Sequence, residues 1–120
     1  MSINQEDNLS LEEVLEICRK AEYNNIEVLY NDVLRPKTFE FLTKYDFDIA
    51  TVKQIIKNLT KEDYQKGPVE DYNPNYKHPF WIFTKHLESI DVEVYIKIKI
   101  INHKRKIIVF SFHKEGEYEL

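Results

Sequence analysis

Four residues in the last third of the chain carry side chains that can act on a phosphate ester. Tyr95, Lys97 and Lys99 alternate with β-branched residues in the stretch VEVYIKIKI, and His113 ends a second alternating stretch, KIIVFSFH. Lysines hold phosphates and stabilise the charge of a pentacoordinate phosphorus. Histidine moves protons near neutral pH, and a phenol hydrogen-bonds phosphate oxygens or stacks on a base. Together these are the groups needed to cleave RNA without a metal.

Three predicted strands would carry these residues. Residues 80–86, 92–101 and 106–113 are rich in β-branched and aromatic side chains, which is typical of strands. The connection NHKR (102–105) is short enough for a hairpin, so we expect the last two strands to pair antiparallel.

The alternation assigns most of these side chains to one face of the sheet. Val92, Val94, Ile96, Ile98 and Ile100 would face the core, which leaves Tyr95, Lys97 and Lys99 on the wet face. On the last strand the uniformly apolar set is expected in the core: Ile108, Phe110 and Phe112. Ser111 and His113 would then share the wet face with Tyr95 and Lys97.

The strand FWIFTK allows two assignments. One set is Trp81, Phe83 and Lys85, and the other is Phe80, Ile82 and Thr84. Periodicity does not decide between them. If the set that ends in Lys85 is exposed, Trp81 adds an aromatic surface beside the lysines.

The N-terminal half predicts helices, over 11–22, 37–45 and 49–58. The first begins with a capping box of Ser10 and Glu13. One more helical turn, KEDYQK, is expected to end at Gly67-Pro68.

A short strand is possible at 26–30, and the Pro-rich stretch 67–79 is expected to be a loop with a function. Helices followed by strands predict an α+β fold, with N-terminal helices packed on one face of a mainly antiparallel sheet. The length of 120 residues predicts one domain spanning residues 1–120.

Composition excludes several other kinds of site. Two glycines are too few for a dinucleotide or P-loop motif, and the single Cys18 excludes an intramolecular disulfide. The four histidines lack metal-ligand spacing, and so we expect no metal and no cofactor. The N-terminal stretch MSINQEDN does not resemble a signal peptide, and no apolar run could span a membrane, which predicts a cytoplasmic protein.

The charge is distributed unevenly along the chain. Residues 1–76 hold nine basic and fifteen acidic side chains, whereas residues 77–114 hold eight basic and three acidic ones. A basic surface that meets a polyanion would explain the difference. The alternative is an ordinary solvated strand face, where lysine also protects exposed edges.

An ordered set of motifs resembles a known family. LTKEDYQKGP, FWIFTK, VYIKIKI and FSFH follow one another between residues 59 and 113. Their order and spacing are similar to those of the MqsR family of bacterial toxins, which are partners in type II toxin–antitoxin pairs. The resemblance covers about residues 47–113.

This resemblance implies a RelE-like fold and a sequence-selective, ribosome-independent endoribonuclease (an mRNA interferase). Lys66, Tyr95 and His113 match basic and tyrosine positions of the family and are the expected catalytic residues. Ile82 stands where some members have glutamine, and Thr84 where many have glycine. The implied partners are single-stranded mRNA and a cognate antitoxin. The expected RNA-binding residues, which come from the face assignment, are Trp81, Lys85, Lys97 and Lys99.

A second class of function fits the same residues. A binding module without catalysis, either a small adaptor or a degenerate toxin relative, would use the tyrosines, Trp81 and Phe83 as a protein interface.

Overall fold

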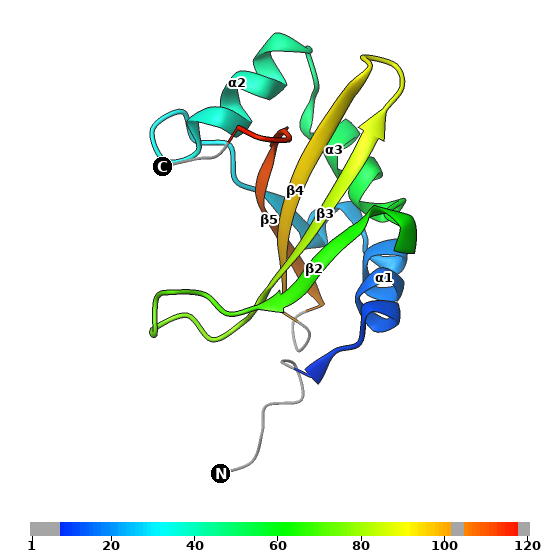
Figure 1. The fold of residues 1–120 in the computed structure, drawn as a ribbon, viewed down its shortest axis with the longest axis vertical. Coiled ribbons are helices and arrows are strands. Elements are labelled where there is room, and N and C mark those ends of the chain that lie inside the picture. Colours follow the sequence, from blue (N-terminus) through cyan, green and yellow to red (C-terminus); the bar gives the residue numbers. More distant parts are fainter. Residues whose placement is uncertain (1–7, 102–104, 118–120) are drawn as a thin grey trace.

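Five strands form one mixed sheet in the order β1-β5-β4-β3-β2 (Figure 1). The strands are β1 (Ile26–Val28), β2 (Tyr64–Val69), β3 (Phe80–Leu87), β4 (Val92–Ile101) and β5 (Lys106–Lys114). β1 runs parallel to β5, and the other neighbouring pairs are antiparallel. This computed structural model describes residues 8–101 and 105–117. The predicted α+β class is confirmed.

Three helices begin and end close to where the sequence predicts. They are α1 (Leu11–Lys20), α2 (Pro36–Lys44) and α3 (Ile49–Lys57), and two 3-10 turns lie at Tyr23–Asn25 and Lys61–Asp63. The capping box of Ser10 and Glu13 is formed. Within the part of the chain that the structure describes, no helix has the length and apolar character needed to cross a bilayer.

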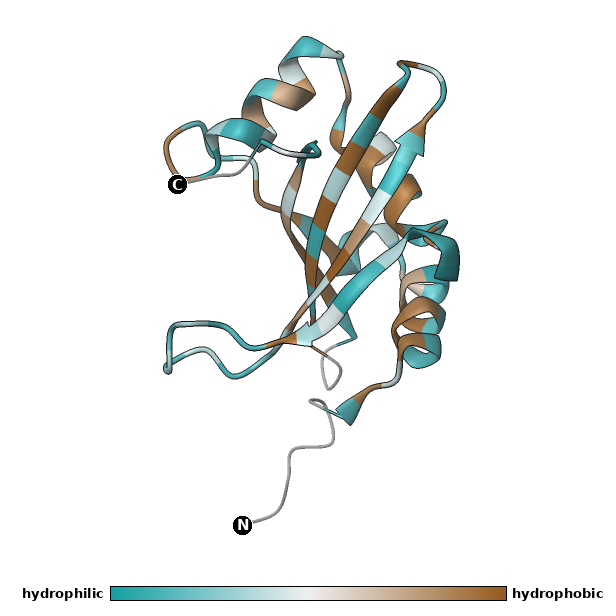
Figure 2. Cartoon of the chain, in the orientation of Figure 1, coloured by the Kyte–Doolittle hydropathy of each residue, from teal (hydrophilic) through white to brown (hydrophobic). Residues whose placement is uncertain are grey.

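One core joins the helices to a single face of the sheet. α1 and α3 pack side by side (Figure 1), and residues of all three helices belong to the same core cluster as Val94, Ile96, Ile98 and Ile100 of β4. Hydrophobic and hydrophilic residues alternate along β4, as predicted (Figure 2). Cys18 is fully buried there, and loss of hydration raises the pKa of its thiol to about 12, which makes it an inert packing residue.

The strand β2 was not predicted. We expected a helical turn over KEDYQK and a loop from Gly67, but the turn ends at Asp63 and residues Tyr64–Val69 pair with β3. β2 is almost wholly hydrophilic (Figure 2) and contains Gly67-Pro68, so it lacks the usual signals of a strand. Proline is tolerated because β2 lies at the edge of the sheet.

A β-bulge corrects the prediction for the last strand. Lys97 pairs with Ser111, but Ile98 pairs with Val109, so Phe110 is the extra residue on β5. The bulge changes which side chains face the helices. Ile107, Val109 and Phe112 are in the core, whereas Phe110 is half-buried on the other side of the sheet.

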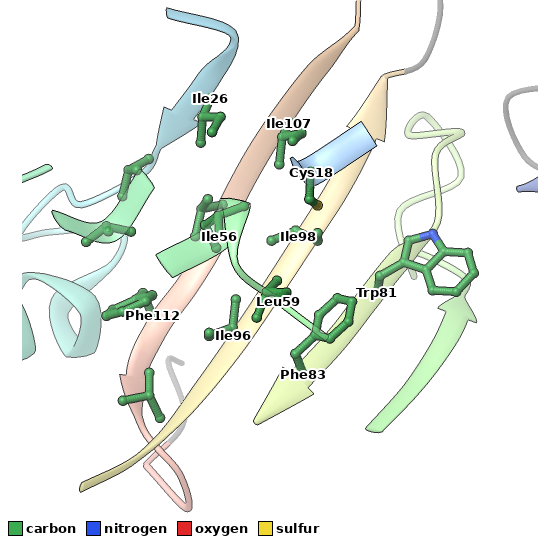
Figure 3. Packing of buried hydrophobic residues seen from close by; sticks show 14 of the residues in the cluster. Cys18, Ile26, Ile56, Leu59, Trp81, Phe83, Ile96, Ile98, Ile107 and Phe112 are labelled. Atoms are coloured by element: carbon green, nitrogen blue, oxygen red, sulfur yellow. The ribbon is translucent and has the colours of Figure 1, made fainter. Parts of the chain in front are cut away.

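The two sets on β3 are now distinguished. Trp81 and Phe83 lie in the core, with exposed fractions of 3% and 0% (Figure 3). Phe80, Ile82 and Thr84 therefore occupy the opposite face. The sequence left this choice open because the apolar content of both sets is nearly equal. In the structure the rings of Trp81 and Phe83 pack against Tyr64 on the helix side, so the exposed position expected for Trp81 was wrong.

The hairpin turn expected at 102–105 falls mainly on residues outside the described ranges. The antiparallel pairing of β4 with β5, which that turn would connect, is confirmed.

Candidate functional site

The side of the sheet that faces away from the helices carries most of the chemically capable residues. We call it the open face. From strand pairing and alternation it comprises Phe80, Ile82, Thr84, Tyr95, Lys97, Lys99, Ile108, Phe110, Ser111 and His113, with Lys66 on β2. The pairing arranges them in three rows across the strands, and residues directly opposite in such a row have Cβ atoms about 4.5–5.5 Å apart.

The first row is Thr84, Tyr95 and His113, from β3, β4 and β5. The rings of Tyr95 and His113 are stacked, with 5.2 Å between centroids and 23° between planes. The predicted proximity of these two residues is therefore confirmed. The phenol and imidazole are in contact on the open face, and a stacked aromatic pair of this kind contributes about 0.5–1.5 kcal/mol.

His113 is nevertheless almost inaccessible, with an exposed fraction of 1%. Its Nδ1 lies 3.0 Å from the Lys114 carbonyl oxygen, and since a carbonyl only accepts hydrogen bonds, Nδ1 carries a proton in this contact. The next residue back, Phe112, donates its backbone N–H to the buried Thr38 hydroxyl at 3.1 Å. Helix α2 thus fixes the end of β5 on which His113 lies.

The second row is Lys66, Ile82, Lys97 and Ser111. Lys66 and Tyr95 line a common hollow of about 310 Å³, together with Gln65, Ile82, Thr84 and Glu115. The structure therefore brings two of the three expected catalytic side chains to one concave site. In the wall of the hollow, the Gln65 side-chain amide donates a hydrogen bond to the Thr84 hydroxyl at 2.8 Å.

Sequence reasoning missed Glu115, the acidic group of this hollow. The backbone N–H of Glu115 donates to the Glu93 carbonyl at 2.9 Å, which extends the β4–β5 pairing by one contact. The signal was available, because the alternation Ser111, His113 continues to residue 115 on the same face. A carboxylate beside a phenol and an ammonium group can accept a proton from a substrate hydroxyl.

The third row contains Phe80 and Lys99, and here the expected exposure of Lys99 on the wet face was wrong, while its expected role in RNA binding stays a prediction. Lys99 is 5% exposed, and its Nζ lies 2.7 Å from Asp71 Oδ2 in the loop between β2 and β3. The strand pattern placed Lys99 on the correct face, but the loop covers it. Its charge is already neutralised, so it is not an exposed RNA contact in this conformation.

Two further open-face groups were not predicted. Phe110, exposed to this side by the bulge, meets Phe80 edge-to-face at 5.1 Å. The Arg35 guanidinium, just before α2, lies 5.4 Å from the Phe110 ring centroid, and Lys97 Nζ lies 4.0 Å from that of Phe80. The aromatic surface expected beside the lysines exists, but it is built from these two phenylalanines instead of Trp81.

Trp81 and Lys85 are absent from the open face. Trp81 belongs to the helix-side core. Lys85 has the same orientation along β3 and forms an ion pair with Asp63 at 3.3 Å. Neither side chain can contact a ligand on the open face.

The described residues contain no group of three His, Cys, Asp or Glu side chains suited to hold a metal ion. The hollow offers an ammonium group, a phenol and a carboxylate, with a second ammonium group, Lys97, in the same row as Lys66. Such a set can bind a phosphodiester and transfer protons at neutral pH.

A scan against protein-family models finds no match for the chain, and no curated protein matches it significantly. The resemblance to the MqsR family therefore depends on the motifs quoted above.

Proposed function

We propose that the protein is the toxin of a type II toxin–antitoxin pair, with a RelE-like fold, and that its open face cleaves single-stranded mRNA. The observation that carries the proposal is that Lys66 and Tyr95 line one hollow while Tyr95 is stacked on His113. The MqsR motifs and the strand pattern select Tyr95 and His113 independently, and the motifs alone add Lys66. The hollow lies on a surface with further cations, Lys97 and Arg35, for the rest of the RNA backbone.

The chemistry follows from the groups in the hollow. The Glu115 carboxylate accepts the proton of a ribose 2′-hydroxyl, and the 2′-oxygen attacks the adjacent phosphorus. The bond from phosphorus to the 5′-oxygen breaks, and the Tyr95 hydroxyl donates its proton to that oxygen. Lys66 stabilises the charge on the phosphate oxygens. Water then returns the proton from Glu115 to Tyr95, leaving a 2′,3′-cyclic phosphate and a 5′-hydroxyl.

In this scheme His113 is a positioning residue. With 1% of its surface exposed, it acts through Tyr95, whose ring it supports from β5. The stacked imidazole fixes the direction of the Tyr95 hydroxyl toward the hollow. This differs from the expectation that His113 itself transfers a proton to or from RNA.

Expression in bacterial cells tests the proposed function. The wild-type protein should slow growth and shorten the half-life of cellular mRNA, and Tyr95→Phe should do neither at equal soluble expression. Co-expression of an adjacent small gene should restore growth. Unhindered growth with verified soluble wild-type protein would contradict the toxin assignment.

The non-catalytic alternative is favoured by one observation, the burial of His113. If the stacked pair served only to pack the sheet, RNA would remain intact and the open face would act as a contact surface. The cleavage assay that closes the Discussion distinguishes these two functions.

A further inference from the structure

The loop between β2 and β3, residues 70–79, covers one end of the open face. It leaves the sheet after Val69 and projects beyond the end of β2 (Figure 1). Residues 72–77 are all exposed, and Tyr72 is completely so. A hollow of about 660 Å³ is lined mainly by this loop, so it is loosely packed. We call residues 70–79 the strap.

Two residues of the strap contact the Lys99 ammonium group. The Asp71 carboxylate accepts a hydrogen bond from Lys99 Nζ at 2.7 Å, and the Tyr76 ring centroid lies 5.3 Å from the same nitrogen. From the sheet side, the Phe80 and Phe110 rings lie 4.5 and 5.4 Å from Lys99 Nζ. The ammonium group is thus enclosed by three rings and one carboxylate.

We propose that Lys99, Phe80 and Phe110 form a second nucleotide subsite, which the strap occupies until single-stranded RNA displaces it. This inference rests on the proposed function, because it assigns RNA as the ligand. The Asp71 carboxylate lies where an RNA phosphate would bind Lys99, and the Tyr76 ring lies where a base would stack. The strap therefore competes with one nucleotide of the substrate.

Electrostatics explains why only another anion can replace the strap. A buried ammonium group without a partner is strongly unfavourable, so Lys99 holds the strap until a phosphate takes over the contact. The phosphate brings an equivalent charge and strong acceptor oxygens. Phe80 and Phe110 form an edge-to-face pair whose rings face the Lys99 ammonium group, and a base that replaces the Tyr76 ring would stack beside them.

The subsite adjoins the catalytic hollow through the strand pairing. Lys99 and Lys97 are two residues apart on β4, and Lys97 in turn lies in the row that contains Lys66. An RNA strand that crosses the rows would place one phosphate on Lys99 and a neighbouring one in the hollow. Displacement of the strap would then be coupled to correct positioning of the cleaved bond.

Binding of a 2′-O-methyl oligonucleotide tests the inference, because this probe lacks the nucleophile and cannot be cleaved. Fluorescence anisotropy would measure its affinity for wild-type protein, Asp71→Asn and Glu70→Gln. The last variant is the matched control, since it removes a neighbouring exposed carboxylate from the same loop. We expect Asp71→Asn to bind on the order of tenfold more tightly than Glu70→Gln, with a plot of log affinity against log salt steeper by about 0.7, as for one added phosphate contact.

A second pair of variants keeps the test valid if Asp71→Asn is unstable. Tyr76→Ala opens the strap without changing its charge and should also raise affinity, whereas Tyr72→Ala, at the exposed tip, should not. Adding Lys99→Met to either opening variant should abolish the gain. Equal affinities of Asp71→Asn and Glu70→Gln, or of Tyr76→Ala and Tyr72→Ala, would overturn the subsite.

Failure of the subsite can be distinguished from failure of the proposed function. If the wild-type protein cleaves RNA but Asp71→Asn and Tyr76→Ala do not raise affinity for the probe, only the proposed subsite under the strap is contradicted. A protein that neither cleaves RNA nor binds the probe in any variant would contradict both.

Discussion

The Tyr95 and His113 rings are stacked across β4 and β5, 5.2 Å apart, although eighteen positions separate them in the chain. The β-bulge at Phe110 makes this contact possible. It allows Ile107 and Val109 to face the core while Ser111 and His113 face the open side. Without the extra residue, the core-facing register of the first half of β5 would turn His113 toward the helices.

Tyr95→Phe removes one hydroxyl and keeps the ring stacked on His113. If that hydroxyl protonates the departing 5′-oxygen, RNA cleavage should fall by about 10²–10⁴-fold, which is typical of a general acid. Single-turnover cleavage rates would measure the loss. Tyr72→Phe is the matched control, because Tyr72 is fully exposed in the strap. The cleavage rate of this variant should stay at the wild-type value.

His113→Phe and His113→Ala separate support of Tyr95 from proton transfer. Phenylalanine keeps an aromatic ring beneath Tyr95 but cannot carry a proton, so we expect His113→Phe to retain most of the cleavage rate. His113→Ala removes the ring and should lower that rate at least tenfold more than His113→Phe. Equal losses in the two variants would instead assign acid–base chemistry to the imidazole. Thermal unfolding of both variants would check that they remain folded.

Trp81 provides a test of which face of β3 meets RNA. Because its indole lies in the core, Trp81→Phe should leave affinity for the 2′-O-methyl probe within about twofold of wild type while lowering the free energy of unfolding. Lys97→Ala should weaken probe binding and reduce the salt slope by about 0.7. Anisotropy titrations at several salt concentrations would measure both effects. A larger loss of affinity in Trp81→Phe than in Lys97→Ala would contradict the assigned open face.

The strap should respond to acid in a defined direction. The hydrogen bond from Lys99, followed by the backbone N–H of Asn73, lowers the pKa of Asp71 below its ordinary 3.8. A carboxyl group with a lowered folded-state pKa stabilises the fold above its unfolded pKa and loses that contribution as pH falls through the folded value. The strap should therefore stay closed at neutral pH and open only below about pH 4. Ring NMR signals of Tyr76 should shift there in wild type but not in Asp71→Asn, whereas a transition near pH 7 would contradict the Asp71–Lys99 contact.

Local signals explain which parts of the fold could be predicted. The caps at Ser10 and Asp48 act within one turn. Asp48 accepts hydrogen bonds from the hydroxyl and then the backbone N–H of Thr51, and these lower the pKa of Asp48. Helix starts therefore depend on residues three positions apart. The alternation of β4 is equally local, because each side chain needs only its neighbours to define a face.

The errors involve partners distant in sequence. β2 becomes a strand because β3 pairs with it, although Gly67 and Pro68 disfavour a strand locally. Gly67 has a φ of 143°, and a Cβ there would lie 3.0 Å from the Phe80 carbonyl oxygen, so the position requires glycine. The bulge at Phe110 and the contact between Asp71 and Lys99 likewise depend on register and loop path, which the pattern of apolar residues does not encode.

The candidate site was predicted only in part, because some of its residues follow a local pattern and others do not. Tyr95, Lys97 and His113 were assigned to one face because they follow a simple alternation. Lys66 was found through motif order alone, since the strand that carries it was not expected. Glu115 was missed because it lies beyond the last predicted strand, and Arg35 because it reaches the open face from the start of α2.

Incubation of the purified protein with a long single-stranded RNA in excess EDTA tests the central claim most directly, with end-group analysis of the fragments. Wild-type protein should give discrete fragments with 2′,3′-cyclic phosphate and 5′-hydroxyl ends, and Tyr95→Phe should give about 10²–10⁴-fold less product in the same time. Intact RNA with folded wild-type protein, fragments with 5′-phosphate ends, or undiminished cleavage by Tyr95→Phe would contradict it.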